Sequence, residues 1–262
     1  MKWIRYYREK NVYYGIVDLQ NKSVAEVQGN PFEDYETTKN VSFSDIKLLT
    51  PFDPKTFYAA GTNYEEHIRK VAELIGEKPN IPTQADIGYR ANNALIAHEE
   101  TIMIPKDATE KVQYEAELVV VIGKKAFQVK ESEALNFVFG YSIGNDVSER
   151  SWQKSDRTLW RAKNSDTFKP MGPWIETEAD LDDMTTSVHV NGVKTIEFKT
   201  NQMIFGVEKY IHEITKYITL YPGDMIWMGT DGEGKNLSDG DTCEITISGI
   251  GTLKNYVRKI NS

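Results

Sequence analysis

The chain has 262 residues and a formal net charge of −8, with 40% hydrophobic and 27% charged residues. This balance is typical of a globular protein that buries a real core, with one large domain or a large domain and a small appendage. The negative charge and the lack of a basic stripe exclude nucleic acid as an expected partner, so an anionic ligand would need a local cationic pocket.

From the sequence we expect neither a targeting signal nor a membrane span. Residues 1–10 carry several charges and no apolar stretch, so we expect no signal peptide. The longest apolar run, residues 118–122, is far too short to cross a bilayer. The single cysteine, Cys243, excludes an intrachain disulfide. We therefore expect a cytoplasmic protein that makes no membrane contact.

The first 49 residues predict a small lobe of strands and turns. Residues 3–7 and 12–17 are rich in strand-forming residues and flank a polar turn, which favours a hairpin. The segment Pro51-Phe52-Asp53-Pro54 then interrupts the pattern. It is the expected boundary between an N-terminal lobe, residues 1–49, and the remaining chain, residues 55–262.

The rest of the sequence is rich in strand patterns and has few helices. Apolar residues at helical spacing predict one helix at residues 65–75, ended by Gly76, and another at 204–218, ended by residues 222–224. Asn191-Gly192 predicts a hairpin turn between two strands. The expected strands are residues 56–60, 111–122, 136–143, 187–190, 193–198, 242–247 and 252–257. This order favours an α+β, mainly β fold over a doubly wound parallel sheet.

Two glutamates stand two positions apart in the apolar segment 114–123. In a strand, alternation places Glu115 and Glu117 on one face, and both faces become apolar within two residues, so the strand is expected to be covered on both sides. Two such carboxylates need a counter-charge. An all-oxygen ligand set suits a hard cation, Mg²⁺, Mn²⁺ or Ca²⁺, and Asp146, after the apolar segment 137–143, is a candidate third ligand.

The spacing of these carboxylates also fits a structural role. Glu115 and Glu117 could lie on an edge strand that faces water, and Asp146 could cap a helix. The spacing alone leaves both interpretations open.

Further motifs follow this cluster in a fixed order and carry a resemblance. They are Tyr114-Glu115-x-Glu117-Leu118, Gly140-Tyr141, Asn145-Asp146-Val147-Ser148-x-Arg150-x-x-Gln153, Lys163-x-x-Asp166-Thr167-Phe168-x-Pro170-x-Gly172-Pro173-Trp174, Val190-Asn191-Gly192, Met203-Ile204-Phe205, Leu220-x-Pro222-Gly223-Asp224, Gly229-Thr230 and Gly249-Ile250-Gly251. In order and spacing they resemble the catalytic domain of the fumarylacetoacetate hydrolase family, from about residue 55 to the end. Residues 1–49 resemble the small N-terminal lobe of its bacterial members.

The resemblance implies a mixed β-roll or barrel-like sandwich, usually a homodimer. It implies that Glu115, Glu117 and Asp146 bind the metal, expected to be Mg²⁺ or Mn²⁺, with Ca²⁺ as an alternative. The family's substrates are small 2-oxo acids, often dicarboxylates or 2,4-dioxo acids. Further residues match family positions in the substrate pocket: Lys163 as a catalytic cation, Arg150 and Gln153 as lining residues, and Thr230 at a substrate carboxylate.

The predicted residues fit this chemistry. A metal bound to a 2-oxo acid acts as the Lewis acid that stabilises an enolate when the adjacent carbon–carbon bond breaks. Three carboxylates and one divalent cation leave a charge of −1, which Arg150 and Lys163 bring to +1. They would form the local cationic pocket that an acidic protein needs to bind a dianion.

The resemblance also identifies a candidate base and three departures. His67, in Asn63-Tyr64-x-x-His67, matches the histidine of a lid helix that activates water. The family often has a glutamate three residues later, but this chain has Lys70, which cannot accept the ring proton. A lysine of the family is replaced by Arg90, which could hold a distal substrate carboxylate bidentately, and a proline after Gly-Thr is replaced by Asp231.

Three functions are therefore compared. The first is hydrolytic C–C cleavage of an acylpyruvate-type 2,4-dioxo acid. The second is the lyase or isomerase chemistry of the family, as in an oxaloacetate decarboxylase or a 2-hydroxyhepta-2,4-diene-1,7-dioate isomerase. The third is binding of metal and 2-oxo acid without turnover, which the retained Glu115, Glu117, Asp146, Arg150 and Lys163 argue against.

Overall fold

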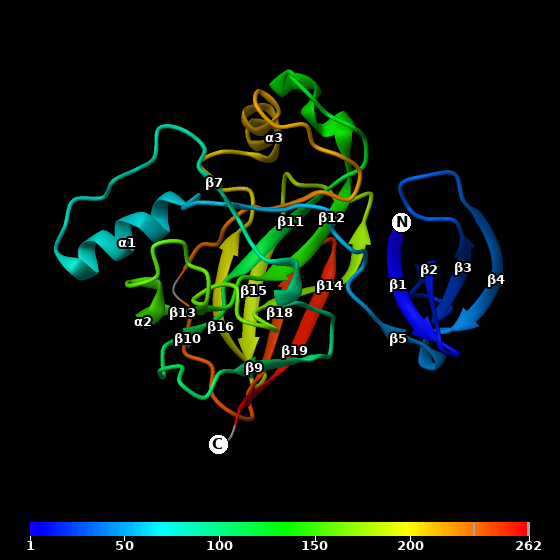
Figure 1. The fold of residues 1–262 in the computed structure, drawn as a ribbon, viewed down its shortest axis with the longest axis horizontal. Coiled ribbons are helices and arrows are strands. Elements are labelled where there is room, and N and C mark those ends of the chain that lie inside the picture. The colour runs from blue at the N-terminus through cyan, green and yellow to red at the C-terminus, as the bar shows by residue number, and fades with distance from the viewer. Residues whose placement is uncertain (233, 261–262) are drawn as a thin grey trace.

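Strands make up most of the fold in the computed structural model, which describes residues 1–232 and 234–260 (Figure 1). The strands are β1 (Lys2–Arg8), β2 (Asn11–Asp18), β3 (Ser23–Gln28), β4 (Glu36–Ser42), β5 (Lys47–Leu48), β6 (Phe57–Ala60), β7 (Ile87–Tyr89), β8 (Leu95–Ile96), β9 (Thr101–Ile104), β10 (Val112–Gln113), β11 (Ala116–Ile122), β12 (Val138–Asn145), β13 (Ser148–Glu149), β14 (Lys169–Glu176), β15 (Thr185–Val190), β16 (Val193–Lys199), β17 (Met225–Trp227), β18 (Thr242–Ile247) and β19 (Gly251–Lys259). The α-helices are α1 (Glu65–Ile75), α2 (Arg150–Gln153) and α3 (Val207–Thr215), and the 3-10 segments are η1 (Phe43–Asp45), η2 (Asn92–Ala94) and η3 (Glu131–Phe137).

The strands of the described residues form three sheets, and the two larger ones pack against each other through a shared apolar cluster. In the described part of the chain, the larger sheet has 12 strands, with the order β4-β3-β2-β1-β14-β12-β11-β17-β6-β7 and with β5 and β8 at its sides. The smaller sheet has five, in the order β16-β15-β18-β19-β9, and β10 pairs with β13. Both sheets are open, since each order runs between two edge strands. The predicted mainly β fold is confirmed, but the strands do not close into a barrel.

Strand β11 runs through the core, and every one of its residues is buried. Leu118 and Val120 pack with residues of the smaller sheet, such as Val188, in one apolar cluster. Val119 and Val121 point to the opposite face and join a second cluster. The prediction of a strand covered on both sides is therefore confirmed. It excludes the interpretation in which these glutamates lie on a solvated edge strand.

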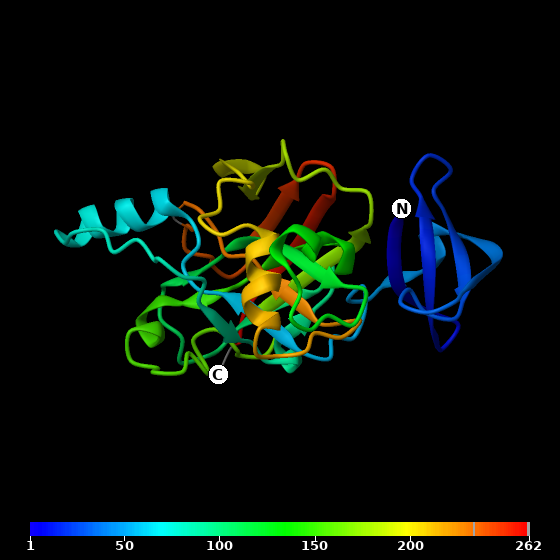
Figure 2. The same ribbon diagram turned by 90° about the horizontal axis from the view of Figure 1, so that it is seen from above.

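The N-terminal strands continue the larger sheet. β1 and β2 form the predicted hairpin, with Glu9 and Lys10 at positive φ in its turn. β1 also pairs with β14, where Lys2 lies opposite Glu176. Figure 2 shows these strands at one end of the molecule and α1 at the other. The division into residues 1–49 and 55–262 remains a prediction, because strand pairing crosses it.

The helices match the predicted positions with two differences. α1 has the predicted bounds, and Gly76 ends it in the left-handed conformation, with φ 73°. Its apolar stripe is only partly covered, since Ala72 is buried but Val71 is 36% exposed. α3 ends at Thr215, well before residues 222–224, because Leu220 pairs with Ala126. None of the helices in the described residues has the length and apolar character of a membrane span.

Two predicted strands differ from the structure at their N-terminal ends. The expected strand 111–122 is divided into β10 and β11, because the backbone N–H of Glu115 donates to the Asn145 side chain instead of to a strand partner. The expected strand at 136–143 begins at Val138, since residues before it form η3. Both deviations leave the glutamates beside the end of β12.

Candidate active site

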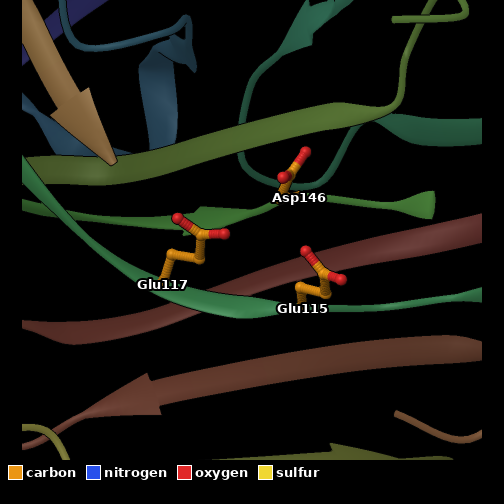
Figure 3. Close-up of side chains that lie close together, drawn as sticks. All are labelled: Glu115, Glu117 and Asp146. Carbon is orange, nitrogen blue, oxygen red and sulfur yellow. The ribbon is translucent and has the colours of Figure 1, made fainter. Parts of the chain in front are cut away.

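Three acidic side chains converge where β11 begins and β12 ends (Figure 3). The antiparallel register places Glu117 opposite Gly144, and the backbone N–H of Asp146 donates to the Glu115 carbonyl at 2.9 Å. One carboxylate oxygen from each of Glu115, Glu117 and Asp146 lies within 4.8 Å of the other two. Figure 3 shows both glutamates on one side of their strand, directed toward the aspartate. The sequence prediction that these three side chains meet agrees with this geometry.

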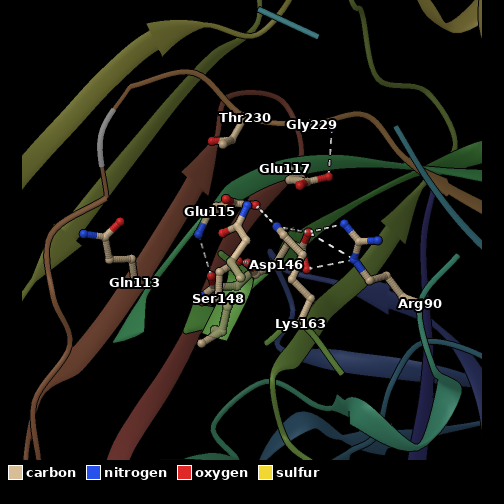
Figure 4. A network of polar contacts seen from close by, with 12 residues as sticks. Arg90, Gln113, Glu115, Glu117, Asp146, Ser148, Lys163, Gly229 and Thr230 are labelled. Atoms are coloured by element: carbon tan, nitrogen blue, oxygen red, sulfur yellow. Dashed lines mark hydrogen bonds and ion pairs between the residues drawn. The ribbon is translucent and has the colours of Figure 1, made fainter. Parts of the chain in front are cut away.

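Four cationic side chains pair with Glu115 or Asp146, and Figure 4 shows two of them, Arg90 and Lys163. The Lys163 ammonium bridges these two carboxylates, at 2.6 Å from Glu115 Oε2 and 2.8 Å from Asp146 Oδ2. Arg150 lies 2.5 Å from Glu115 Oε1. The other two cations contact Asp146: Arg90 Nη2 at 2.9 Å and Lys169 Nζ at 2.7 Å. With all three carboxylates ionised, these groups have a net charge of +1.

The cations keep two of the carboxyl groups ionised. Burial favours the neutral form of Asp146, but the charges of Arg90, Lys163 and Lys169 outweigh it and hold its pKa well below the usual value. Burial likewise acts on Glu115, but the charges of Lys163 and then Arg150 lower its pKa. Both groups therefore offer charged oxygens at neutral pH.

Glu117 has a different environment. Burial raises its pKa to about 8, and the negative charges of Asp146 and Glu115 add to this effect. Its Oε2 accepts a hydrogen bond from the Gly229 backbone N–H at 2.8 Å, and among the described residues it has no ion pair with a lysine or arginine. Glu117 is thus the member of the cluster whose charge the protein compensates least.

The donor set fits a hard divalent cation. Glu115, Glu117 and Asp146 offer only carboxylate oxygens, which Mg²⁺, Mn²⁺ and Ca²⁺ prefer. Glu117 lacks a counter-charge that such an ion would supply. The Lys163 ammonium between two of the carboxylates shows that a positive charge is already stabilised there. The assignment of these residues as metal ligands remains a prediction.

The cluster forms one wall of a cavity of about 190 Å³. Five predicted residues outside the cluster also line it: His67, Arg90, Gln153, Lys163 and Thr230. Leu159, residues 60–63 and Gly229 complete the lining. The cavity therefore joins the candidate metal ligands to the predicted base and to most of the predicted substrate-binding residues.

His67 has an orienting partner that the sequence did not indicate. Its Nδ1 lies 3.0 Å from the carbonyl oxygen of Gly232. The Lys70 ammonium pairs with Glu66 Oε1 at 2.6 Å on the same helix. The sequence had suggested that His67 lacks an acceptor for its ring proton, because residue 70 is a lysine. The Gly232 carbonyl is such an acceptor.

Three predicted substrate-binding residues have partners within the protein. Arg90 lines the cavity, but its Nε and Nη2 donate to Asp146, so its guanidinium is already engaged by a carboxylate. Arg150 lies behind Glu115 and donates to Gln153 Oε1 at 2.9 Å. The Thr230 hydroxyl donates to the Asp231 carbonyl at 3.3 Å. Their roles toward a substrate remain predictions, and the structure adds for Arg90 and Arg150 the role of counter-charge.

Lys169 belongs to the site, although the sequence analysis did not select it. It is fully buried at the start of β14, and its ammonium also donates to the carbonyls of Val147 and Phe168. Burial lowers its pKa to about 8, against the opposing effect of Asp146. The sequence did contain one signal for this residue, a single lysine in an otherwise apolar strand pattern. Such a lysine indicates a buried ion pair, because lysine is almost never fully buried unless it is paired.

The open sheets and the buried carboxylate cluster are features of one enzyme family, which comparison with known proteins establishes. The family model described as fumarylacetoacetate (FAA) hydrolase, C-terminal, matches residues 56–258. A second model, Rv2993c-like, N-terminal, matches residues 1–51. The chain therefore belongs to the fumarylacetoacetate hydrolase family, as the motifs predicted.

Relatives match over most of their length. Protein Rv2993c of Mycobacterium tuberculosis is 38% identical over 224 residues, 84% of this chain and 82% of that protein. The structure of 5-carboxymethyl-2-hydroxymuconate delta-isomerase from Mycobacterium smegmatis is 33% identical, with a TM-score of 0.89 over 99% of this chain and 100% of the other. Fumarylacetoacetate hydrolase from Exiguobacterium antarcticum is 27% identical, with a TM-score of 0.84 and the same coverage. Similar structures thus include both an isomerase and a hydrolase.

Proposed function

We propose that this chain is a divalent-metal-dependent enzyme that hydrolyses a carbon–carbon bond in a small acylpyruvate-type 2,4-dioxo acid. The observation that supports it is the shared cavity: the three carboxylates lie in the same space of about 190 Å³ as His67 and Lys163. Enolate stabilisation and water activation, the two requirements of this reaction, are thereby offered in one place.

The residues of the chain would share the binding of a dianionic substrate. Glu115, Glu117 and Asp146 would hold Mg²⁺ or Mn²⁺, with Ca²⁺ as an alternative, and the ion when bound would act as a Lewis acid toward a 2-oxo acid. Lys163 would face the substrate's oxygens as a preorganised cation. Gln153 and Thr230, which line the cavity, would accept or donate hydrogen bonds to its polar groups.

His67 would act as the general base in this reaction. A neutral imidazole takes a proton from water, and the hydroxyl oxygen bonds to the carbon of the 4-oxo group. The bond between that carbon and the neighbouring methylene carbon then breaks, and its electron pair remains on the pyruvate fragment as an enolate. Protonation of this enolate gives pyruvate and a carboxylic acid, so atoms and charge balance.

An isomerase is the second candidate, because the 33% identical structure from Mycobacterium smegmatis is that of a 5-carboxymethyl-2-hydroxymuconate delta-isomerase. Isomerisation of a dienedioate needs proton transfer between carbons but no added water. Decarboxylation of oxaloacetate needs neither proton transfer between carbons nor an added water. Products therefore distinguish the three reactions, and binding without turnover would give no product.

The proposal is tested by assaying acylpyruvates, oxaloacetate and 2-hydroxyhepta-2,4-diene-1,7-dioate with Mg²⁺, Mn²⁺ and a chelator. We expect acylpyruvate hydrolysis that the chelator abolishes and that either ion restores. We expect His67→Ala to lower hydrolysis by about 10²–10⁴-fold, while a measurable share of any oxaloacetate decarboxylation remains. His189→Ala, on β15 outside the cavity, is the matched control. If the protein converts the dienedioate and none of the other substrates, the hydrolase proposal is wrong and the isomerase takes its place.

A further inference from the structure

We propose that the Asp231-Gly232 turn sets the tautomer and orientation of His67, with Asp231 acting as a positioning residue through the Gly232 peptide. The importance of this arrangement for catalysis rests on the proposed function, but the arrangement itself does not. The Gly232 carbonyl would take the place of a hydrogen-bond acceptor on α1 (Glu65–Ile75).

The contact between His67 and Gly232 determines which ring nitrogen carries the proton. A carbonyl oxygen can only accept a hydrogen bond, so Nδ1, 3.0 Å away, must be the donor. In the neutral ring the lone pair then belongs to Nε2. Because His67 lines the cavity that contains the carboxylate cluster, this tautomer makes Nε2 the basic nitrogen available to a water there.

The peptide between Asp231 and Gly232, which precedes the carbonyl that faces His67, is held in place by its neighbours. Asp231 Oδ1 accepts from the Gly232 backbone N–H at 2.7 Å, and the Asp231 side chain is buried, with the residue only 4% exposed. The Thr230 hydroxyl donates to the Asp231 carbonyl at 3.3 Å. Gly232 has φ +79°, a conformation in which other residues are strained. The Asp231 side chain thus fixes the peptide before the carbonyl that faces His67, and a backbone conformation specific to glycine directs the carbonyl from there.

The same loop also touches the carboxylate cluster. The Gly229 backbone N–H donates to Glu117 Oε2 at 2.8 Å, three residues before Gly232. Residues 229–232 therefore connect Glu117 at one end with His67 at the other. Displacement of this loop would move the base relative to the cluster.

Helix α1 offers no carboxylate at the equivalent place. Residue 70 is one helical turn after His67, where side chains are neighbours, but it is a lysine whose ammonium pairs with Glu66 Oε1 at 2.6 Å. Near the lid, the sequence departs from the family's pattern at positions 70 and 231. Both departures thus concern the same feature, the group that orients His67. The acceptor that orients His67 comes from the loop instead of from the helix.

Nitrogen-15 NMR of the imidazole nitrogens tests this directly at alkaline pH, where the ring is neutral and its two tautomers give different shifts. His67 is assigned by comparison with His67→Gln. We expect the wild-type protein to show the Nδ1–H tautomer. Asp231→Ala should shift the population toward the Nε2–H form that free histidine prefers in water, whereas Asp231→Asn, which keeps an oxygen at Oδ1, should retain the wild-type spectrum.

Steady-state kinetics give the second readout. We expect Asp231→Ala to lower kcat by about 10–100-fold with little change in KM, and Asp231→Asn to remain within about threefold of the wild type. A wild-type Nε2–H tautomer would overturn the proposal without any variant, even if Asp231→Ala failed to fold. An unchanged His67 spectrum in Asp231→Ala would also overturn it. Because the spectra need no turnover, they decide the proposal even if the chain hydrolyses no acylpyruvate.

Discussion

Asp146 forms ion pairs with three largely buried cations, Arg90, Lys163 and Lys169. Buried charges are tolerated only when they are paired and hydrogen-bonded, so each of these side chains is constrained by the others. Residue spacing predicted the carboxylates, because alternation along a strand is a local property. It could not predict Lys169 as a partner, because that contact joins β14 to the loop after β12 and depends on tertiary packing.

Lys163→Met removes one positive charge beside the predicted metal and substrate while keeping most of the side chain's length. We expect kcat/KM to fall by the equivalent of about 2–4 kcal/mol of transition-state stabilisation. Metal affinity should not decrease, because a neighbouring cation is lost. Steady-state kinetics and calorimetric metal titration measure the two effects. Lys194→Met, in an exposed pair with Glu197, is the control, and wild-type kinetics for Lys163→Met would contradict the assignment.

Lys169→Met removes a buried cation from Asp146 and a hydrogen-bond donor from the carbonyls of Val147 and Phe168. Breaking a buried ion pair by removing one partner costs about 3–5 kcal/mol. We therefore expect the free energy of unfolding, measured with urea, to fall by about this amount. Lys216→Met, at an exposed position of the molecule, should change it little. A loss below about 1 kcal/mol would show that Lys169 is not a structural counter-charge.

Among the elements, those defined by short-range patterns agree best with the sequence. The bounds of α1 follow from its apolar spacing and Gly76, and the β15–β16 hairpin follows from Asn191-Gly192. Element ends that depend on distant partners were wrong, as for α3, whose exit is determined by the pairing of Leu220 with Ala126. The pairing of β1 with β14, which joins residues about 170 positions apart, could not be predicted from local pattern at all.

The β1–β14 junction carries a pH-dependent contact at Glu176. Burial would raise the pKa of this carboxyl group, but hydrogen bonds from Lys2, the N-terminal ammonium and the Glu178 backbone N–H outweigh it and lower the pKa to about 2. A carboxyl group whose pKa is depressed in the folded state stabilises that state fully above its unfolded pKa, near 4.5. The contribution is lost as pH falls from that value through about 2.

Glu176→Gln should therefore be less stable than the wild type at pH 6, and the difference should shrink steadily as the pH is lowered below about 4.5. Urea denaturation at a series of pH values measures it. Glu178→Gln, which changes an exposed carboxylate two residues later, is the control. A difference between wild type and Glu176→Gln that is the same at every pH would show that this pair does not stabilise the junction through its charge.

For the whole molecule, an acidic chain with a net charge of −8 gathers four cations around two carboxylates, and two of these cations, Arg90 and Lys163, line the cavity. Family membership, the mainly β fold and the meeting of the three carboxylates could be predicted because ordered motifs span nearly the whole chain. The orientation of His67 by the Gly232 carbonyl could not, because a backbone acceptor leaves no mark in the sequence. The expected homodimer remains a prediction.

The central claim is that Glu115, Glu117 and Asp146 bind one divalent cation. A crystal soaked in Mn²⁺ and measured near the manganese absorption edge tests it most directly. We predict a single strong anomalous peak within about 2.0–2.6 Å of one oxygen from each of the three residues. Carboxylates that stay paired with Lys163 and Lys169 in the soaked crystal, with no anomalous peak between them, would contradict the claim.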